Sequence, residues 1–390
     1  MRVVTTFILA AFLVFTAFVL LQLSHLIANE NSNVKLIRTD SSVLRSVSRA
    51  ISPSIKLSPR PPPALLEEQV KSYKKPIVIS IVTGHYLGNF GYNTETDPRP
   101  PCMIQDVRVN CSLEGPQRRE TADALWYHIP HMSLAGLQPR YHPNQLRVAM
   151  SMESAAYYPL MENPDLRKEV DILSTYKYTA DNVNHYYDRN FDEDEKNFLT
   201  PPKVPTAQKK NVVAYMNRNC GAKNGRNDVV KELSKYITID GYGCIGSSNR
   251  VDKVEVFSKA KFCIAMENSN VEWYVTEKIY QAFQAGCLPI YMGAPNFEKD
   301  FLPHPKAVIL YKPESMNPKM LAEKLHQIAN NDTLYEEHMA WRKMQLHELL
   351  PGFQRVVAFG RRPNPECRLC MKVAELRYLK EKNATLKSSN

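Results

Sequence analysis

The stretch Lys261–Pro295 has the pattern of a single βαβ unit, and it restricts the fold more than any other part of the chain. An apolar run, Phe262–Met266, is followed by a polar elbow, Glu267–Asn270, and then by apolar residues at helical spacing. Gly286 supplies a helix stop, and Leu288–Met292 is typical of the next strand. We therefore predict a parallel α/β domain around this stretch.

The helix of this unit begins with residues that suit a bound nucleotide. Thr276 is a residue type that caps helices, and Glu277 and Lys278 occupy the first turn. Ligands of such units bind beyond the carboxyl ends of the strands, at helix N-termini. We expect Glu277 and Lys278 to lie where a ribose and phosphates would bind.

The N-terminal segment contains no Asp, Glu, Lys or Arg from Val3 to Asn29. Its apolar run is long enough to span a bilayer and exceeds the core of a cleaved signal peptide, which is about 7–15 residues. Leu26–Ala28 is also a poor cleavage site. We predict that residues 1–28 form a short cytoplasmic tail and a signal-anchor helix, so that the protein is single-pass type II with a lumenal catalytic domain.

Residues 29–75 are predicted to be a stem, because they are rich in Ser and basic residues and contain Arg60–Pro63. Three N-glycosylation sequons are consistent with a lumenal location, at Asn110, Asn331 and Asn383. The eight cysteines are an even number, which permits disulfides in an oxidising compartment. The net charge of +10 is spread along the chain and indicates a solvated basic surface and not a nucleic-acid partner.

The rest of the chain is predicted to form two α/β domains facing a cleft. Domain boundaries are set at 76–205, 206–373 and a tail at 374–390, with Asp188–Pro205 as an interdomain linker. The expected strands of the first domain are Pro76–Gly84, Ala122–His128, Leu146–Met152 and Val170–Tyr176. Before the βαβ unit, the second domain is expected to contain strand Val212–Met216, helix Asp228–Tyr236, strand Ile237–Asp240 and turn Gly241–Gly243; helices Met320–Ala329 and Leu334–Leu346 follow the unit.

Four motifs in order resemble glycosyltransferase family 10, the α1,3/α1,4-fucosyltransferases. They are Met152–Pro159 (MESAAYYP), Asn219–Arg226 (NCGAKNGR), Glu267–Lys278 with Leu288–Ile290, and Cys367–Cys370 (CRLC). The first, second and fourth are most similar to plant-type members that act on the N-glycan core. The resemblance spans about residues 76–373. It implies a GT-B fold of two Rossmann-like domains, with the acceptor bound by the first and GDP-fucose by the second, and an inverting displacement.

The family's catalytic carboxylate matches Glu153, which would take the proton of the acceptor hydroxyl. The alternative for Glu153 is an ordinary solvated or salt-bridged surface carboxylate. Arg226 and Lys278 match the diphosphate clamp, although isolated basic residues at helix starts are usually just solvated. Glu277 would accept hydrogen bonds from the ribose, and it also suits the helix dipole.

The remaining donor-site candidates are aromatic or amide residues. Asn268 and Tyr274 would contact the fucose and phosphates, unless Asn268 merely makes a turn. Tyr242 would pack on the guanine or reach a phosphate, with core packing as the alternative. Tyr176 is a further candidate, in a segment that departs from the family pattern of animal members.

The family resemblance further implies that Cys367 and Cys370 form disulfides with Cys102 and Cys111. A zinc half-site or a redox motif is the alternative for this CxxC, but no second CxxC is present. Cys220, Cys244, Cys263 and Cys287 are left open, and the apolar context of Cys263 and Cys287 also fits buried thiols. No metal-binding spacing is found, so no cofactor is expected to be obligatory, with Mn²⁺ or Mg²⁺ as stimulants at most.

These expectations describe a Golgi fucosyltransferase that moves fucose from GDP-fucose to a GlcNAc hydroxyl of a glycoprotein N-glycan, in α1,3 linkage on the core. Lewis-type antennae and protein hydroxyls are the alternative acceptors. A catalytically silent lumenal glycan-binding protein of the same fold is the alternative from another class.

Overall fold

The computed structural model describes residues 64–84, 92–187 and 198–388. The chain divides into two compact units, Met1–Ala64 and Leu65–Asn390, and all elements below belong to the second. The predicted signal-anchor and most of the predicted stem lie outside the described residues, as does most of the predicted linker. In the described ranges, no helix is both long enough and apolar enough to cross a bilayer.

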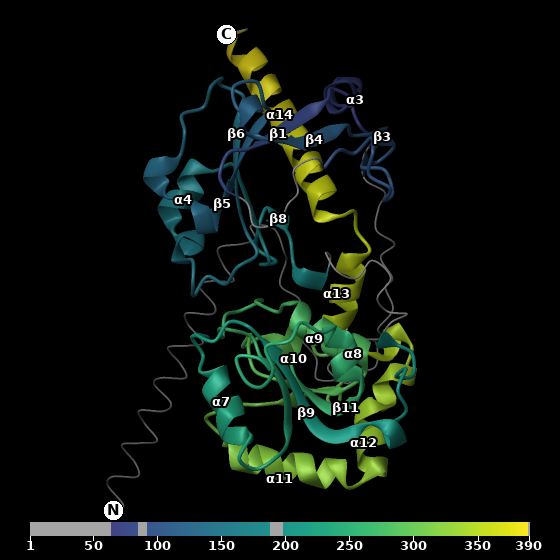
Figure 1. Cartoon of the computed structure of the whole chain (residues 1–390). Helices are drawn as coiled ribbons and strands as arrows, with labels where there is room; N and C mark the ends of the chain where they lie inside the picture. The colour runs from purple at the N-terminus through teal and green to yellow at the C-terminus, as the bar shows by residue number, and fades with distance from the viewer. Residues whose placement is uncertain (1–63, 85–91, 188–197, 389–390) are drawn as a thin grey trace, which may run out of the picture. The chain divides into compact units, whose positions relative to one another are not determined.

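The first sheet has six parallel strands in the order β4-β1-β5-β6-β7-β8. Strands β1, β4, β5, β6 and β8 are labelled in Figure 1. The four predicted strands are confirmed with small boundary changes as β1 (Ile77–Ile81), β5 (Ala124–His128), β6 (Leu146–Ser151) and β7 (Ile172–Thr175). The sequence did not predict the two edge strands β4 (Cys111–Glu114) and β8 (Asn182–Val183), nor the antiparallel pair β2 (Met103–Ile104) and β3 (Val107–Arg108). These strands are too short to present a recognisable period.

The second sheet has five parallel strands in the order β10-β9-β11-β12-β13. Their bounds are β9 (Lys210–Asn217), β10 (Ile239–Gly243), β11 (Ala260–Ile264), β12 (Leu288–Tyr291) and β13 (Ile309–Leu310). The predicted turn Gly241–Gly243 is wrong, because these residues pair with Tyr215–Asn217 as the end of β10. The predicted α/β class with two parallel sheets is confirmed.

Side chains of β11 alternate between two apolar cores, as expected for a sheet covered on both faces. Phe262 and Ile264 belong to one core, and Cys263 belongs to the other. Helices α7 (Arg226–Leu233), α11 (Pro318–Ala329) and α12 (Asp332–Met339) contribute to the first core, whereas α8 (Lys253–Ser258), α9 (Glu277–Ala285), α10 (Phe297–Asp300) and α13 (Pro351–Gly360) contribute to the second.

The last helix, α14 (Pro365–Ser388), corrects the predicted tail at 374–390, because it packs with the first sheet. The Arg377 guanidinium donates to the Ser72 carbonyl at 2.7 Å and to Asp123 Oδ1 at 3.1 Å. Ser72 belongs to α3 (Glu67–Tyr73), a helix within the predicted stem. The stem prediction is therefore wrong for these residues: α3 and α14 pack together.

All eight cysteines form disulfides. The predicted ties are confirmed as Cys102–Cys367 and Cys111–Cys370, which join the CxxC at the start of α14 to the first sheet region. The pairs left open are Cys220–Cys244 and Cys263–Cys287. The interpretation of Cys263 and Cys287 as buried thiols is wrong, since β11 and β12 are neighbours and bring them together.

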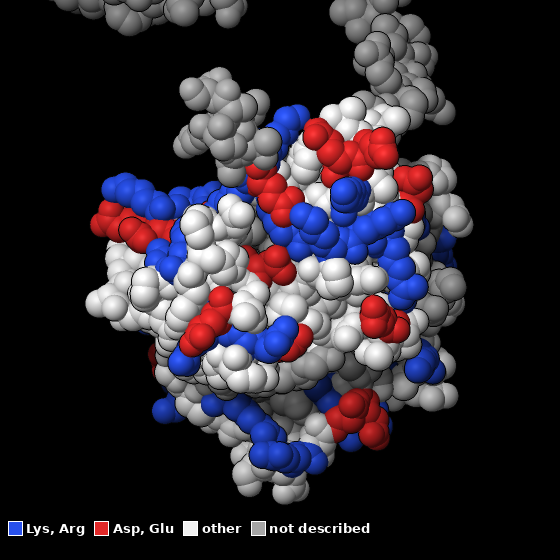
Figure 2. All heavy atoms as spheres, turned by 90° about the horizontal axis from the view of Figure 1, so that it is seen from above, with Lys and Arg blue, Asp and Glu red and all other residues white. Residues whose placement is uncertain are grey.

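Lys and Arg side chains gather on the face in Figure 2, with Asp and Glu side chains among them. Both signs are therefore interspersed on this face. Such mixing favours a solvated surface over a continuous basic footprint for a polyanion.

Candidate active site

The candidate site is built around Glu267, which follows β11 and is completely buried. Its carboxylate accepts two hydrogen bonds from Thr276, from the backbone N–H at 2.8 Å and from the hydroxyl at 2.7 Å. Thr276 is the N-cap residue of α9 as predicted, but its hydroxyl bonds to Glu267 and not to a helix N–H. The elbow is therefore fastened to the start of α9.

Lys278 joins this arrangement from the first turn of α9. Its Nζ donates to the Thr276 hydroxyl at 2.7 Å and lies 3.3 Å from both Glu267 Oε2 and Glu277 Oε1. Burial lowers the pKa of Lys278, but Glu267 and Glu277 outweigh burial and hold the pKa above its ordinary value. The ammonium group is thus fixed in its charged form at a helix N-terminus.

Glu277 carries a negative charge beside this cation. Burial raises its pKa, but Lys278 and Lys253 outweigh burial and hold the pKa below its ordinary value. An ionised carboxylate of this kind can accept hydrogen bonds from vicinal hydroxyls. Its predicted ribose contact is chemically possible here and remains a prediction.

Arg226 is the first residue of α7 and is 1% exposed. Its Nη1 donates to the Met266 carbonyl at 2.8 Å and its Nη2 to the Asn219 carbonyl at 3.4 Å, so the guanidinium links the ends of β11 and β9. Its Nε is buried without a hydrogen-bond partner among the described residues. The charge of Arg226 acts on Lys278, lowering its pKa, so the two predicted phosphate ligands belong to one cluster.

Lys253, the first residue of α8, is a member of this cluster that the sequence did not predict. Burial lowers its pKa to about 8, and the charges that act on it are those of Glu277, Lys278, Glu267 and Arg226. The described residues offer its Nζ no hydrogen bond or ion pair, although the ammonium lies 5.3 Å from the Phe257 ring centre. A lone Lys in a charged helix carries no signal that distinguishes it from a solvated residue.

Glu153 lies on the loop that follows β6, half-buried. Burial raises the pKa of its carboxyl, Lys278 lowers it, and Glu277 raises it further. The two residues that act on Glu153 are therefore the predicted donor ligands of the second sheet. A carboxylate with a raised pKa is suited to receive a proton.

The loop of Glu153 is tied to the elbow by hydrogen bonds. Ser269 Oγ donates to Ser154 Oγ at 2.6 Å. The Tyr157 hydroxyl donates to the Asn268 carbonyl at 3.3 Å and accepts from the Lys223 N–H at 3.0 Å. These contacts bring the predicted catalytic and donor-binding motifs together at the carboxyl ends of β6, β9 and β11.

Two predicted donor-site aromatics are mainly packing residues in this structure. Tyr274 is 2% exposed, and its ring lies 5.1 Å from that of Tyr176 in an edge-on arrangement. The Tyr176 hydroxyl accepts from the Ala155 N–H at 3.2 Å, which supports the Glu153 loop from below. Burial raises the pKa of both phenols, so both stay neutral.

The other two candidates, Asn268 and Tyr242, are half-buried. Asn268 Oδ1 lies 3.2 Å from the Ser269 hydroxyl oxygen, within the same turn. Tyr242 pairs with Met216 in the sheet and bridges to Ser247. No described contact joins Tyr242 to the charged cluster, and its donor contact remains a prediction.

The three sequons differ in accessibility. Asn331 and Asn383 are exposed, on or next to α12 and α14, whereas Asn110 is half-buried with its Oδ1 enclosed. The Asn331 side chain also caps α12 by accepting from the Leu334 N–H at 3.0 Å. Within the described residues, no three His, Cys, Asp or Glu side chains are grouped so that they could hold a metal ion.

Residues 206–388 match the family model described as glycosyltransferase family 10 (fucosyltransferase) C-terminal domain. The chain is 31% identical over 238 residues to a fucosyltransferase-like protein of Arabidopsis thaliana, covering 60% of this chain and 44% of that protein. It is 28% identical over 247 residues to glycoprotein 3-alpha-L-fucosyltransferase A of Drosophila melanogaster, covering 62% and 44%. It is 31% identical over 215 residues to GDP-fucose protein O-fucosyltransferase 3 of Xenopus laevis, covering 47% and 45%.

The chain thus aligns with less than half of the length of each of these relatives. A crystal structure of an α1,3-fucosyltransferase superposes with a TM-score of 0.50 at 19% identity, covering 74% of this chain and 93% of that one. This likeness confirms that the fold is GT-B-like.

Proposed function

We propose that this chain, whose C-terminal half carries the family 10 fucosyltransferase domain, is an inverting α1,3-fucosyltransferase that uses GDP-fucose. Its acceptor is a GlcNAc hydroxyl of a glycoprotein N-glycan, with the core GlcNAc favoured. The catalytic domain works in the Golgi lumen on a type II membrane anchor, and no metal is obligatory.

The charged cluster supplies what the donor requires. Lys278 sits at the N-terminus of α9, where its ammonium and the helix dipole attract a diphosphate. Arg226 adds a second positive charge. Lys253 adds a third, and its ammonium has no hydrogen bond or ion pair among the described residues. As the bond to fucose breaks, its electron pair leaves with GDP, and these cations stabilise the charge that grows on the β-phosphate.

Glu153 supplies the base on the opposite side of the fucose. The acceptor oxygen forms the new bond to the anomeric carbon while its proton passes to the Glu153 carboxylate. Direct displacement requires the attacking and leaving oxygens to lie on opposite faces of the sugar, which inverts the anomeric centre. With the base and the clamp on separate loops, the proposal places the acceptor and the diphosphate on opposite sides of the fucose.

The observation that carries the proposal is the 2.6 Å hydrogen bond between Ser154 and Ser269. Ser154 follows the base in the chain, and Ser269 lies on the elbow that holds Glu267. One hydrogen bond therefore connects the two halves of the reaction, and a silent glycan-binding protein would need neither the base nor the paired cations.

The relatives divide over the acceptor, since one is named for glycoprotein 3-alpha-L-fucosyl transfer and another for protein O-fucosyl transfer. The MESAAYYP and CRLC motifs support the N-glycan core acceptor. Lewis-type antennae and protein hydroxyls are the alternative acceptors.

The test is an acceptor panel. The purified full chain is incubated with GDP-fucose and, in turn, a core N-glycopeptide, a LacNAc antenna and an unglycosylated folded protein domain, and the products are read by mass spectrometry. Fucose on the innermost GlcNAc alone is the expected result. Transfer to another acceptor would replace the acceptor assignment, and no transfer with no GDP-fucose hydrolysis would favour the glycan-binding alternative.

A further inference from the structure

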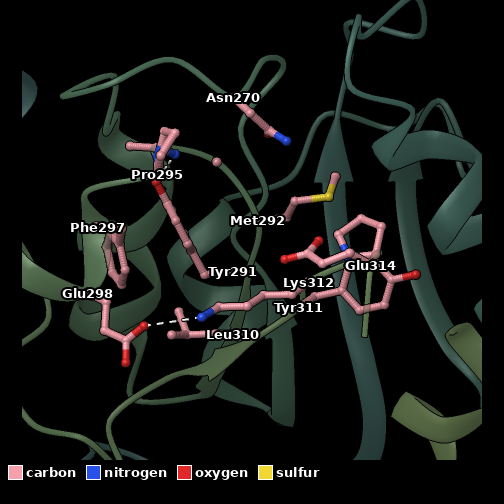
Figure 3. Close-up of a pocket in the computed structure, with 13 residues that line it drawn as sticks. Asn270, Tyr291, Met292, Pro295, Phe297, Glu298, Leu310, Tyr311, Lys312 and Glu314 are labelled. Carbon is pink, nitrogen blue, oxygen red and sulfur yellow. Dashed lines mark hydrogen bonds and ion pairs between the residues drawn. The ribbon is translucent and has the colours of Figure 1, made fainter. Parts of the chain in front are cut away.

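A cavity of about 330 Å³ lies beyond the carboxyl ends of β12 and β13 (Figure 3). Four residues of its lining have almost no exposure: Tyr291, Met292, Phe297 and Tyr311. Its rim consists of exposed polar and charged residues: Asn270, Glu298, Lys312 and Glu314. An apolar floor with a few polar groups at the mouth is the usual composition of a small-molecule site.

The cavity shares a wall with the donor cluster. Gly293 lines it, and a Cβ built on this glycine would lie 2.6 Å from Glu267 Cγ, so the wall lies against the side-chain methylene of the buried Glu267. Asn270 Oδ1 accepts from Asn224 Nδ2 at 2.8 Å, and the same nitrogen donates to the Glu267 carbonyl at 3.0 Å. A ligand in the cavity would therefore lie next to a bound donor.

The rim favours a neutral ligand with hydroxyl groups. Lys312 is the cation of the rim and lies 3.3 Å from Glu298 (Figure 3), which leaves Glu314 without an ion pair among the described residues. The resulting excess of negative charge opposes the entry of an anion. The Glu314 carboxylate accepts hydrogen bonds from hydroxyls, and the Asn270 side chain extends toward the cavity with its amide nitrogen at the tip (Figure 3).

We propose that this cavity is a saccharide subsite, which binds one neutral pyranose unit of the acceptor glycan away from the hydroxyl that receives fucose. The inference rests on the proposed function for the acceptor being a glycan. Its position beside the clamp and its size, at the lower end of the range of about 300–1,000 Å³ for ligand pockets, fit one sugar ring.

The test compares two acceptors, chitobiosyl-asparagine and the same core extended by three mannoses, with the full chain. Glu314→Trp places an indole at the mouth of the cavity, and Glu323→Trp on the exposed side of α11 is the matched control. Binding of the free oligosaccharides is measured by saturation-transfer NMR without donor, and transfer kinetics with GDP-fucose.

The extended acceptor should bind the wild type about tenfold more tightly than chitobiosyl-asparagine. Glu314→Trp should erase this difference with GDP-fucose hydrolysis unchanged, and Glu323→Trp should preserve it. Equal binding of both acceptors to the wild type, or an equal loss for both in Glu314→Trp, would overturn the subsite. If the chain transfers no fucose but still binds the extended acceptor more tightly, the proposed function is rejected and the saccharide subsite is retained.

Discussion

Lys278 Nζ lies 3.3 Å from Glu267 Oε2, and the Thr276 hydroxyl between them donates to that same carboxylate oxygen and accepts from that same ammonium. The carboxylate is completely buried and the Lys278 side chain is 13% exposed. Because Glu267 cannot reach solvent, the fold fixes the pair, and the pair keeps the Lys278 ammonium in place at the start of α9.

Glu267→Gln should test this pairing. The change leaves Lys278 without its buried counter-charge, so it should lower the free energy of unfolding by about 3 kcal/mol and raise the KM for GDP-fucose about tenfold or more. Glu255→Gln is the control, since it breaks the exposed Lys259–Glu255 pair and should change the free energy of unfolding only slightly. Denaturant unfolding gives the first quantity and initial rates the second; equal effects of the two variants would contradict the pairing.

The pH dependence of transfer should report Glu153. Burial raises the pKa of this base above its ordinary value of 4.5, and only the ionised form accepts a proton, so kcat/KM should fall as pH drops through a value above 4.5. Glu277→Gln removes a like charge and should move this acid limb to lower pH. If the acid limb lies at the same pH in Glu277→Gln as in the wild type, the charge of Glu277 does not act on Glu153. That result would contradict the described site.

Lys253→Met should show whether the ammonium of Lys253 contributes to binding of GDP-fucose. The pKa of Lys253 is lowered to about 8 by burial, so the group is charged below that pH and neutral above it. The wild-type KM for GDP-fucose should therefore rise as pH increases through about 8, whereas Lys253→Met should have a higher KM with a flatter profile. Lys259→Met, at an exposed position just after α8, should retain the wild-type profile. Identical profiles for wild type and Lys253→Met would exclude a donor contact.

The disulfides should differ in their contribution to stability. Cys102–Cys367 and Cys111–Cys370 run in parallel, so either one alone keeps the long loop closed; removing both by Ser substitution opens a separation of 259 residues or more and should cost at least about 5 kcal/mol in the chain-entropy model. Cys263–Cys287 closes only 24 residues and should cost about 3 kcal/mol by the same model. Denaturant unfolding of the variant that lacks both long-range disulfides and of the variant that lacks Cys263–Cys287 gives the comparison; the reverse order would show that local packing outweighs chain entropy.

The positions of the strands in both sheets lay within reach of sequence reasoning wherever a strand had a clear apolar run, as β6 and β11 do. Short edge strands and α14 did not, because a two-residue strand has no period and α14 is apolar on too little of its surface to stand out from a tail. The predicted tail packs through tertiary contacts such as those of Arg377 with Ser72 and Asp123, and the two disulfides fasten the start of α14 just before it.

In the candidate site, the family resemblance pointed to Glu153 and Arg226, and the helix pattern together with the resemblance pointed to Glu277 and Lys278; the structure brings these residues into one electrostatic cluster. Glu267 was visible only as part of a polar elbow. Glu267 can pair with Lys278 as it does because it is completely buried, and burial of a Glu cannot be predicted from the residue type alone.

The most direct test of the account is single-turnover fucose transfer by wild type and Glu153→Gln at saturating GDP-fucose, with GDP affinity measured on the same preparations. Because Gln cannot accept the proton, the rate should fall by about 100-fold or more. GDP affinity should be retained or slightly increased, since Gln keeps the clamp residues in place and removes a negative charge that acts on Lys278. A Glu153→Gln variant that keeps the full rate of transfer would contradict the assignment of the base, and with it the mechanism.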